Sequence, residues 1–294
     1  MDIVISYVNG LDPLWQQDYQ KASRTPAAAK RYRDWGTLPY LLRGIEKYMP
    51  FIDRVFLVVA RESQVPDWAD RSRLQVVLHS EIIPAPYLPT FNSTTIEMFL
   101  YRIPGLSEQF IYFNDDIFPV MDCTPEDFFL NGRPAIGFAR HLLHGNLYKQ
   151  QVHQSDRMAR KALGLRPGLT YIRPQHTCTP MLRSACEEVF KRIAPQILAS
   201  LTPFRDSRNV CQYLFTDYLY LSRRATARRL SNRHISLSAV SPRRLDQAIR
   251  NPDRKLICIN DVEMNQERFL AFQKVIHEAF SERFPERSVY EREP

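Results

Sequence analysis

The ten residues from Gln109 to Phe118 constrain the fold more than any other part of the chain. Strand-forming residues lead into two adjacent carboxylates, Asp115 and Asp116, and apolar residues resume at once. An apolar run of this kind is typical of a buried strand in a parallel sheet. Unpaired carboxylates are costly to desolvate beside such a strand. We therefore expect them at its C-terminal end, where open α/β sheets bind ligands.

Taken alone, this acid pair has two interpretations. Adjacent carboxylates suit a hard divalent cation, which takes oxygen ligands and is often shared with phosphates. Alternatively, Asn114 and Asp115 form a turn in which their side chains satisfy nearby backbone groups. The rest of the chain favours the cation site.

The 294-residue chain has a net charge of +8, and its excess of bases is local. Between Arg140 and Arg173 there are seven Lys or Arg residues and one acid, Asp156, and between Arg223 and Arg244 there are seven Arg residues and no acid. Such stretches bind nucleic acid, acidic lipid headgroups or an acidic glycan, unless they form a solvated basic face. No helix-turn-helix, zinc-finger or RNP-like motif is present, so we do not expect nucleic acid as a partner.

No apolar stretch approaches the length of a membrane span, and Met1 leads directly into an expected strand without a signal-like leader. We therefore expect a cytoplasmic protein, and leave open peripheral contact at the inner membrane face. Five cysteines lack the spacing of zinc or redox pairs, which indicates reduced core thiols. They are Cys123, Cys178, Cys186, Cys211 and Cys258.

The first half of the chain alternates expected strands and helices. Strands are predicted at residues 2–8, 54–60, 74–78 and 109–113, and helices at 37–48 and 93–101, with a mobile loop at 27–33. This β-α-β alternation favours an α/β fold with a mostly parallel sheet flanked by helices.

The second half is less regular. Helices are predicted at residues 179–193, 209–221 and 263–284, and a short strand at 255–259. In the last helix Phe269, Phe272, Ile276 and Phe280 share one face, so this helix should pack on the sheet. We expect a single catalytic domain over residues 1–294, with a helical, basic insertion at residues 140–174.

Four blocks of sequence carry the chemistry. The first is Asp2 to Pro13; the second runs from Arg31-Tyr32-Arg33-Asp34 through Leu88-Pro89-Thr90-Phe91-Asn92-Ser93 to Asn114-Asp115-Asp116; the third contains His176 and Phe204-Arg205-Asp206; the fourth contains Ile257 to Asp261 and Phe284 to Ser288. In this order the blocks resemble the Stealth family of sugar-phosphate transferases, which includes bacterial capsule polymerases and the lysosomal-enzyme N-acetylglucosamine-1-phosphotransferase.

The resemblance implies a GT-A-like nucleotide-sugar fold and a divalent cation, Mg²⁺ or Mn²⁺. It implies transfer of a hexose-1-phosphate, usually an N-acetylhexosamine-1-phosphate, from a UDP-sugar donor to a hydroxyl of a glycan acceptor. A phosphodiester forms and UMP leaves, in capsule or cell-surface polysaccharide synthesis. Two alternatives are an ordinary metal-dependent GT-A glycosyltransferase, which releases UDP, and a non-catalytic relative that binds glycans or anions.

Acids in the matched blocks suit a cation bound to a pyrophosphate. Asp115 and Asp116 are the expected metal ligands, and Asp261, which ends a second strand, completes the site. For Asp261 the alternative is a turn formed with Asn260.

Arginine and histidine in the same blocks suit phosphate binding and proton transfer. Arg205 can grip a phosphate through two N–H groups, and Arg33 next to Asp34 is a similar case. His176 titrates near neutral pH, so it suits proton transfer at the acceptor hydroxyl or contact with the leaving phosphate. The alternatives are a surface salt bridge for Arg205 and a structural role for His176. Asp34, Asp12 and Asp116 are competing bases.

The loop after the first strand is the expected nucleotide site. Its residues Tyr7, Val8, Asn9, Gly10 and Asp12 follow the strand directly, and Gly10 permits close backbone approach. Asn114 also belongs to the expected site, as does Asn92, whose alternative role is to cap a helix.

This chain departs from the family pattern at two positions. The first block usually reads Val-Asp-Gly, whereas this chain has Asn9 in the middle, so a role of that acid is either lost or carried by Asp12. Trp35 stands where the family often has Asn. Both changes bear on the identity of the donor more than on the class of reaction.

Overall fold

The computed structural model describes residues 1–23, 25, 27 and 29–293 of the chain. The chain forms two compact units, each assembled from separated segments of sequence. Unit 1 contains Met1–Val4, Val77–Tyr112 and Glu126–Leu230, and unit 2 contains Ile5–Val76, Phe113–Pro125 and Ser231–Pro294. The single catalytic domain expected from the sequence stays a prediction.

The largest sheet has five strands. Hydrogen-bonded neighbours follow the order β10 (Thr179–Leu182), β4 (Gln109–Asn114), β1 (Asp2–Ser6), β2 (Arg54–Val59) and β3 (Leu74–Leu78). In this sheet β10 runs antiparallel to β4, whereas in a separate three-stranded sheet β12 (Asn232–Ser236) runs parallel to β13 (Leu256–Asn260), so the sheets of the chain combine both kinds of pairing. The predicted α/β class is therefore confirmed, with mixed sheets and helices.

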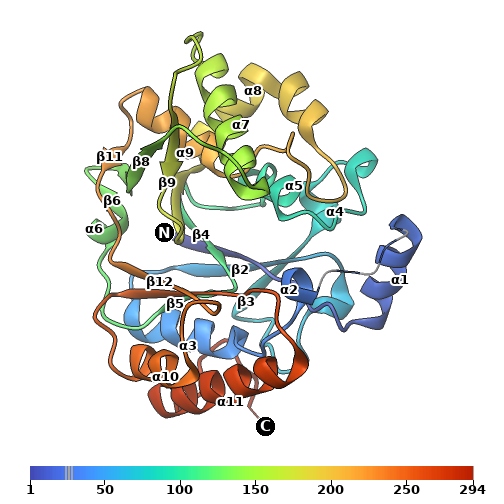
Figure 1. Ribbon diagram of the computed structural model, residues 1–294, viewed down its shortest axis with the longest axis vertical. Coiled ribbons are helices and arrows are strands. Elements are labelled where there is room, and N and C mark those ends of the chain that lie inside the picture. The colour runs from blue at the N-terminus through green and yellow to red at the C-terminus, as the bar shows by residue number, and fades with distance from the viewer. Residues whose placement is uncertain (24, 26, 28, 294) are drawn as a thin grey trace. The chain divides into compact units, whose positions relative to one another are not determined.

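Helices dominate unit 1. Its helices α7 (Leu147–Ala162), α8 (Arg183–Ser200) and α9 (Tyr213–Leu221) pack against one another (Figure 1). Both α7 and α9 contact β9 (Tyr171–Pro174), which pairs antiparallel with β8 (Phe138–His141). The unit's other elements are α4 (His79–Ile82), α5 (Ser93–Glu97), α6 (Pro125–Phe128), β6 (Phe129–Leu130), β7 (Arg133–Ile136), β11 (Thr226–Ala227) and the 3₁₀ turns η2 (Ala85–Tyr87) and η3 (Leu100–Arg102).

Unit 2 combines strands with amphipathic helices. Its helices α10 (Pro242–Arg250) and α11 (Gln266–Arg283) lie side by side (Figure 1), and α3 (Leu38–Tyr48) packs on β5 (Ile117–Pro119). A Cβ atom on Gly44 would lie 2.6 Å from the Pro119 carbonyl oxygen, so only glycine permits this approach. The unit's other elements are α1 (Pro13–Ala22), α2 (Ala29–Tyr32) and the 3₁₀ turn η1 (Glu62–Gln64).

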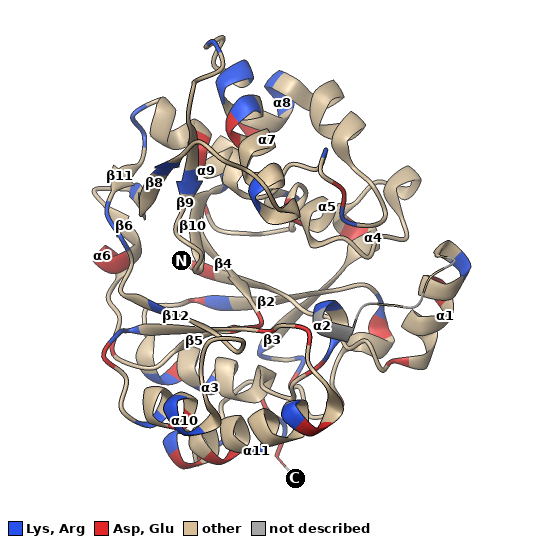
Figure 2. Ribbon diagram, viewed as in Figure 1, with Lys and Arg blue, Asp and Glu red and all other residues tan. Residues whose placement is uncertain are grey.

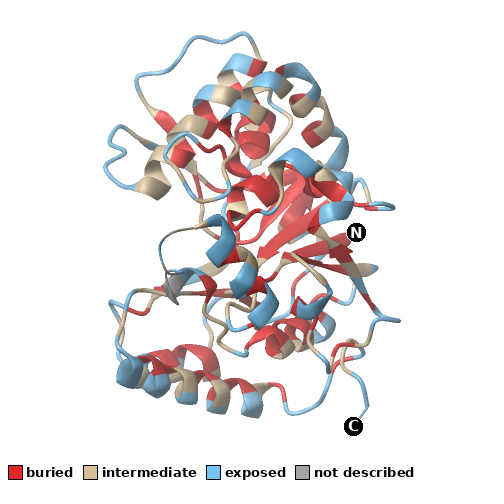
Figure 3. Cartoon of the chain, turned by 90° about the vertical axis from the view of Figure 1, so that its right-hand side faces the viewer, coloured by how far each residue is buried: buried red, intermediate tan, exposed pale blue. Residues whose placement is uncertain are grey.

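Burial explains why the predicted elements form. Residues 110–113 of β4 are at most 1% exposed, as the apolar run predicts, and the strands in Figure 3 are buried along most of their length. Helix α11 buries Phe269, Phe272, Ile276 and Phe280 on one face, so that prediction is confirmed. All five cysteines are buried as thiols. Within the described ranges, no helix is both long and apolar enough to cross a membrane.

Three local predictions are wrong. Residues 179–182 form strand β10 instead of the start of a helix, because they hydrogen-bond to β4. The helix predicted at 93–101 is the short α5 followed by η3. The loop predicted at 27–33 contains helix α2, although Ala28 within it lies outside the described residues.

Candidate active site

Four carboxylates gather in unit 2 around the end of β4. Asp115 and Asp116 form the turn between β4 and β5, and Asp261 directly follows β13. The carboxylates of Asp116, Asp34 and Asp261 all lie close enough to Asp115 to raise its pKa by charge repulsion. The structure thus brings together the three acids expected at the cation site and adds Asp34 to them.

The antiparallel pairing of β5 with β13 explains this convergence. Cys258 lies opposite Ile117 in the pairing, and the Ile259 N–H donates to the Asp116 carbonyl at 2.8 Å. The Cys258 thiol donates to the Asp116 carboxylate at 3.6 Å. The chain therefore leaves β13 at Asp261 beside the turn that carries the acid pair.

Asp34 is fixed between the end of β1 and a tight turn. The Tyr7 hydroxyl donates to one Asp34 carboxylate oxygen at 2.7 Å, and the Gly36 N–H donates to the other at 2.8 Å. Gly36 has a φ of +69°, in the left-handed region that favours glycine. Each of the two Asp34 carboxylate oxygens thus accepts a hydrogen bond that fixes its position.

Asp261 is held by the two neighbours of Asp34. Arg33 pairs with Asp261 at 3.5 Å while its guanidinium lies 4.6 Å from the Phe269 ring centre. Trp35 donates its indole N–H to the other Asp261 oxygen at 3.1 Å. The departure from the family pattern at Trp35 therefore orients a proposed metal ligand in this chain.

Burial and mutual repulsion favour protonation within this cluster. Burial is the largest cause that raises the pKa of Asp115 to about 8, and repulsion from Asp116, Asp34 and Asp261 adds to it. Burial also raises the pKa of Asp261, although Arg33 and the Trp35 N–H oppose it. The donor set fits a hard divalent cation, because carboxylate oxygens are its preferred ligands and its charge would relieve this repulsion.

The raised pKa of Asp115 predicts a pH-dependent stability effect. An acid with a raised folded pKa destabilises the fold as pH rises from its unfolded value near 3.8 towards 8, because only the unfolded state ionises freely. In chelator, we therefore expect Asp115→Asn to melt a few degrees above the wild type at pH 8 and level with it at pH 4. Differential scanning calorimetry checks this. A melting difference that does not change with pH would contradict it.

A pocket of about 290 Å³ opens beside Asp34 in unit 2. Its lining includes Tyr7, Asn9, Gln64 and Trp68, which present aromatic faces and amide groups. The expected nucleotide loop therefore borders a real cavity. Burial, followed by the charges of Asp34 and Asp115, raises the pKa of Tyr7, so its hydroxyl remains a hydrogen-bond donor. The other two expected residues, Val8 and Asn114, are partly exposed in this unit.

Asp12 holds the loop in place. It caps α1 by accepting from the Leu14 and Trp15 N–H groups, and it accepts from Ser63 and Gln64 at 2.5 and 2.7 Å. Burial opposes ionisation, but these hydrogen bonds outweigh it and lower the pKa of Asp12. Asp12 thus has a structural role, and the ligand or base role expected from the sequence stays a prediction.

Asn9 and Gly10 shape the same loop. The Asn9 side chain accepts from the Leu11 N–H at 2.8 Å, and its backbone N–H donates to Gln64 at 2.7 Å. An aspartate would accept the same turn hydrogen bond, so the change to Asn9 leaves the loop intact. The close approach expected at Gly10 is to the Tyr32 carbonyl oxygen, which would lie 2.3 Å from a Cβ atom there.

Arg205 lies in unit 1, in the loop between α8 and α9. It donates to the Ser93 hydroxyl at 2.8 Å. The carboxyl of Glu97 is buried, which raises its pKa, and the charge of Arg205 opposes that rise. The Arg205 guanidinium is thus held at Ser93, the first residue of α5. Within the described ranges, no carboxylate forms an ion pair with Arg205.

His176 also lies in unit 1, after β9. Its ring is edge-on to Tyr148, and its Nδ1 atom lies 3.5 Å from the Tyr213 hydroxyl. Burial, followed by the charges of Arg173 and Arg205, lowers the pKa of His176. The imidazole is therefore neutral at pH 7, the form that accepts a proton.

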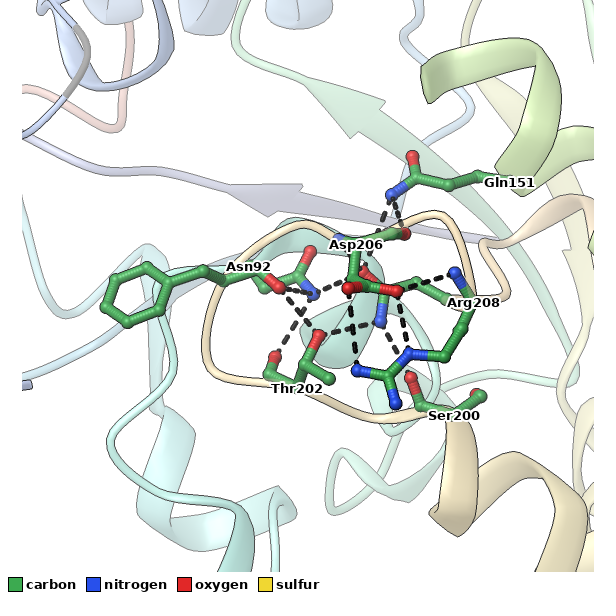
Figure 4. Close-up of polar contacts among 8 residues, drawn as sticks. Asn92, Gln151, Ser200, Thr202, Asp206 and Arg208 are labelled. Carbon is green, nitrogen blue, oxygen red and sulfur yellow. Dashed lines mark hydrogen bonds and ion pairs between the residues drawn. The ribbon is translucent and has the colours of Figure 1, made fainter. Parts of the chain in front are cut away.

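Asn92 has a structural role, and its expected contact with the nucleotide stays a prediction. It is fully buried, its side-chain oxygen caps α5 at Thr94, and its amide donates to Thr202, Phe204 and Asn209 (Figure 4). All of its hydrogen-bonding capacity lies inside the fold, which is the capping role that the sequence left open.

Asn209 joins this network to the loop that carries Arg205. Its amide donates to the Ser200 carbonyl and the Thr202 hydroxyl at 2.7 and 2.8 Å, and its oxygen accepts from Asn92 and from the Asp206 N–H (Figure 4). The two buried asparagines thus hydrogen-bond to the backbone of Phe204 and Asp206, the residues on either side of Arg205.

Loss of Asn209 should loosen this loop. We expect Asn209→Ala to lower the free energy of unfolding by about 2–3 kcal/mol, because buried partners lose their hydrogen bonds. The matched control is Arg208→Ala in the same loop, where only an exposed ion pair with Asp206 is lost and the free energy of unfolding should stay close to that of the wild type. Urea denaturation of both variants checks this. Equal losses would contradict a special role for Asn209.

Sequence reasoning missed Gln64 and Asn209. Both are buried polar residues, at 2% and 1% exposure, that organise loops next to predicted site residues. Neither lies in a recognisable motif. The partners of Gln64 are remote in sequence, and Asn209 combines partners in its own loop with the remote Asn92. The Phe204-Arg205-Asp206 block was the nearest available signal for Asn209.

Comparisons with known proteins give the relatives of the chain. Residues 31–135 match the family model described as Stealth protein CR2, conserved region 2. The receptor polysaccharide phosphotransferase WefC of Streptococcus oralis is 42% identical over 138 residues, which span 44% of this chain but only 41% of WefC. The capsular polysaccharide phosphotransferase WcwK of Streptococcus pneumoniae is 27% identical over an alignment that covers 99% of both chains. A crystal structure of the galactosyltransferase LgtC with donor and acceptor sugar analogs is 12% identical and covers 96% of each chain, with a TM-score of 0.43.

The family match falls on the candidate site. Residues 31–135 include Arg33, Asp34, Asp115 and Asp116, and the alignment with WcwK extends over almost the whole chain. The order of the sequence blocks, the gathered carboxylates and these matches agree. The chain belongs to the Stealth family.

Proposed function

We propose that this protein is a metal-dependent sugar-1-phosphate transferase in capsule or cell-surface polysaccharide synthesis. It takes a hexose-1-phosphate, an N-acetylhexosamine-1-phosphate in our proposal, from a UDP-sugar to a hydroxyl of a glycan acceptor. The observation that carries the proposal is the gathering of Asp34, Asp115, Asp116 and Asp261 around one carboxyl whose pKa is raised to about 8. The names of WefC and WcwK, both polysaccharide phosphotransferases, support it.

The reaction exchanges one phosphorus–oxygen bond for another. The acceptor oxygen attacks the sugar-proximal phosphorus, and the bond from that phosphorus to the bridging oxygen breaks. The bridging oxygen leaves with UMP, the hydroxyl proton passes to a base, and the anomeric carbon–oxygen bond is untouched. Such a transfer needs charge neutralisation and in-line positioning more than covalent catalysis.

The residues of unit 2 supply positioning for this chemistry. Asp115, Asp116 and Asp261 would hold Mg²⁺ or Mn²⁺, which when bound neutralises charge on the pyrophosphate. Arg33 and Trp35 keep Asp261 in place, and Tyr7 keeps Asp34 in place. Asp34 is the candidate base in this unit, because a carboxylate fixed by a donor has little freedom to lose on reaction.

The pocket beside Asp34 would hold the uracil base. It is large enough at about 290 Å³, and the amide of Gln64 and the ring of Trp68 offer hydrogen bonding and an apolar wall. The phosphates would then lie towards the carboxylates, since Tyr7 and Asp34 belong to both the pocket and the acid cluster.

A donor panel tests the proposed function. The purified protein is incubated with a series of UDP-sugars and a polysaccharide acceptor, with Mg²⁺, with Mn²⁺ or with chelator, and the nucleotide product is identified by chromatography. We expect UMP, and only when the cation is present. Release of UDP would instead show an ordinary glycosyltransferase, and no turnover with any donor would favour the non-catalytic alternative.

A further inference from the structure

Two loops of unit 1 expose large apolar side chains. The loop after β8 exposes Leu142 at 67% and Leu143 at 76%, and the loop before β9 exposes Leu165 at 45% and Leu169 at 95%. A single exposed leucine needs no explanation, whereas several in neighbouring loops mark an interaction surface.

Strand pairing brings the two loops together. His141 lies opposite Tyr171 in the antiparallel pair of β8 and β9, so both loops leave from the same end of this two-stranded sheet. The Tyr171 hydroxyl donates to the Leu143 carbonyl at 3.0 Å, and the rings of His141, His144 and His153 lie around Tyr171. These contacts hold the two loops against β8 and β9, while the leucines of both loops remain exposed to solvent.

The same region is strongly basic. Figure 2 shows Lys and Arg on α7 and in the loop that follows it. Among residues that the structure describes, no carboxylate forms an ion pair with any of five bases of this region. They are Arg140 on β8, Lys149, Arg157 and Lys161 on α7, and Arg166 in the loop after α7. The only acid between residues 140 and 173 is Asp156, which is 2% exposed and paired with Arg160 at 2.7 Å. The surface therefore offers positive charge together with exposed leucines.

We propose that these loops dock on a membrane surface rich in acidic phospholipids. The leucines enter the boundary between headgroups and acyl chains, and the surrounding bases contact headgroup phosphates, as in other interfacial segments. A phosphorylated glycan would also attract the bases, but it would gain nothing from Leu142, Leu143 and Leu169. The leucines therefore favour a lipid surface over a soluble polyanion. This inference uses only residues of unit 1 and does not rest on the proposed reaction.

Vesicle sedimentation tests the inference with the full chain. We expect binding to phosphatidylcholine vesicles that contain phosphatidylglycerol, and little binding to phosphatidylcholine alone. The variant Leu142→Ser/Leu143→Ser/Leu169→Ser should bind at least about tenfold more weakly, because its apolar contact is lost. The variant Lys161→Gln/Arg166→Gln should weaken binding by about fivefold per base.

Matched controls carry the same changes on other surfaces. Met121→Ser/Leu270→Ser/Val289→Ser removes three other exposed apolar side chains, and Arg243→Gln/Arg244→Gln removes two other exposed bases. Both should bind vesicles as the wild type does. The proposal is overturned if the wild type does not bind acidic vesicles, or if the loop variants bind no worse than their controls. It is also overturned if analytical ultracentrifugation shows that the leucines join two copies of the chain, or if the loop variants raise the acceptor KM while vesicle binding is absent.

Discussion

Replacing either acid of the turn after β4 should abolish transfer while leaving the fold intact. We expect Asp115→Asn and Asp116→Asn each to lower kcat/KM by at least about 1000-fold, because in the proposed function each supplies a charged ligand to the cation on the donor pyrophosphate. Both side chains border the same cluster with Asp34 and Asp261, and an asparagine keeps their shape. Steady-state kinetics at saturating Mg²⁺, with circular dichroism to monitor the fold, measure the effect.

The control is Asp122→Asn, which makes the same change on an exposed residue a few positions further along the chain. It should retain full activity. Near-normal turnover in both Asp115→Asn and Asp116→Asn would remove the basis of the cation site. Loss of activity in all three variants would point to a general effect of charge.

His176→Ala and Arg205→Ala should both lose most activity, but with different pH dependence. The pKa of His176 is lowered by burial, with smaller effects from Arg173 and Arg205, so its protonation limits activity only below the ordinary imidazole range. His176→Ala should therefore flatten the acid limb of the pH–rate profile. Arg205→Ala should lower turnover at every pH, because the variant lacks the permanently charged group that we expect to bind a phosphate.

The two residues are also coupled, which gives a sharper test. Arg205 is one of the charges that lower the pKa of His176, so Arg205→Ala should move the remaining acid limb to higher pH. Arg205→Lys keeps the positive charge but loses the planar guanidinium, which can donate two parallel hydrogen bonds. We therefore expect this variant to keep the acid limb of the pH–rate profile at the wild-type pH while its kcat is low. If His176→Ala keeps both full turnover and the wild-type limb, Asp34 or Asp116 is the base instead.

Strong periodic or apolar patterns allowed much of the fold to be predicted. The apolar run of β4, the alternation of the first half and the single apolar face of α11 each depend on local burial, which sequence records directly. Residues 179–182 show where prediction from local sequence fails. Their sequence is compatible with a helix, but pairing with β4 overrides that propensity, and the partner is remote in sequence.

The acids of the candidate site could be predicted from the sequence, whereas the residues that hold its loops in place could not. Asp115, Asp116 and Asp261 stand at the ends of recognisable strands, so their convergence follows from sheet geometry. The roles of Asp12 and Asn92 as caps could not be separated from ligand binding, because a capping side chain and a ligand-binding side chain are of the same residue types. Gln64 and Asn209 gave no signal, since a buried amide becomes visible only through its tertiary partners.

The way in which unit 2 is assembled affects the protein during its synthesis. The carboxylates come from three separated stretches, and the contact between Cys258 and Asp116 spans 142 residues. Closing so large a loop is slow compared with forming local helices. A nascent chain therefore cannot gather its four carboxylates until β13 and Asp261 have left the ribosome. Products of premature termination before residue 256 lack β13 and Asp261, so they cannot bring the four carboxylates together.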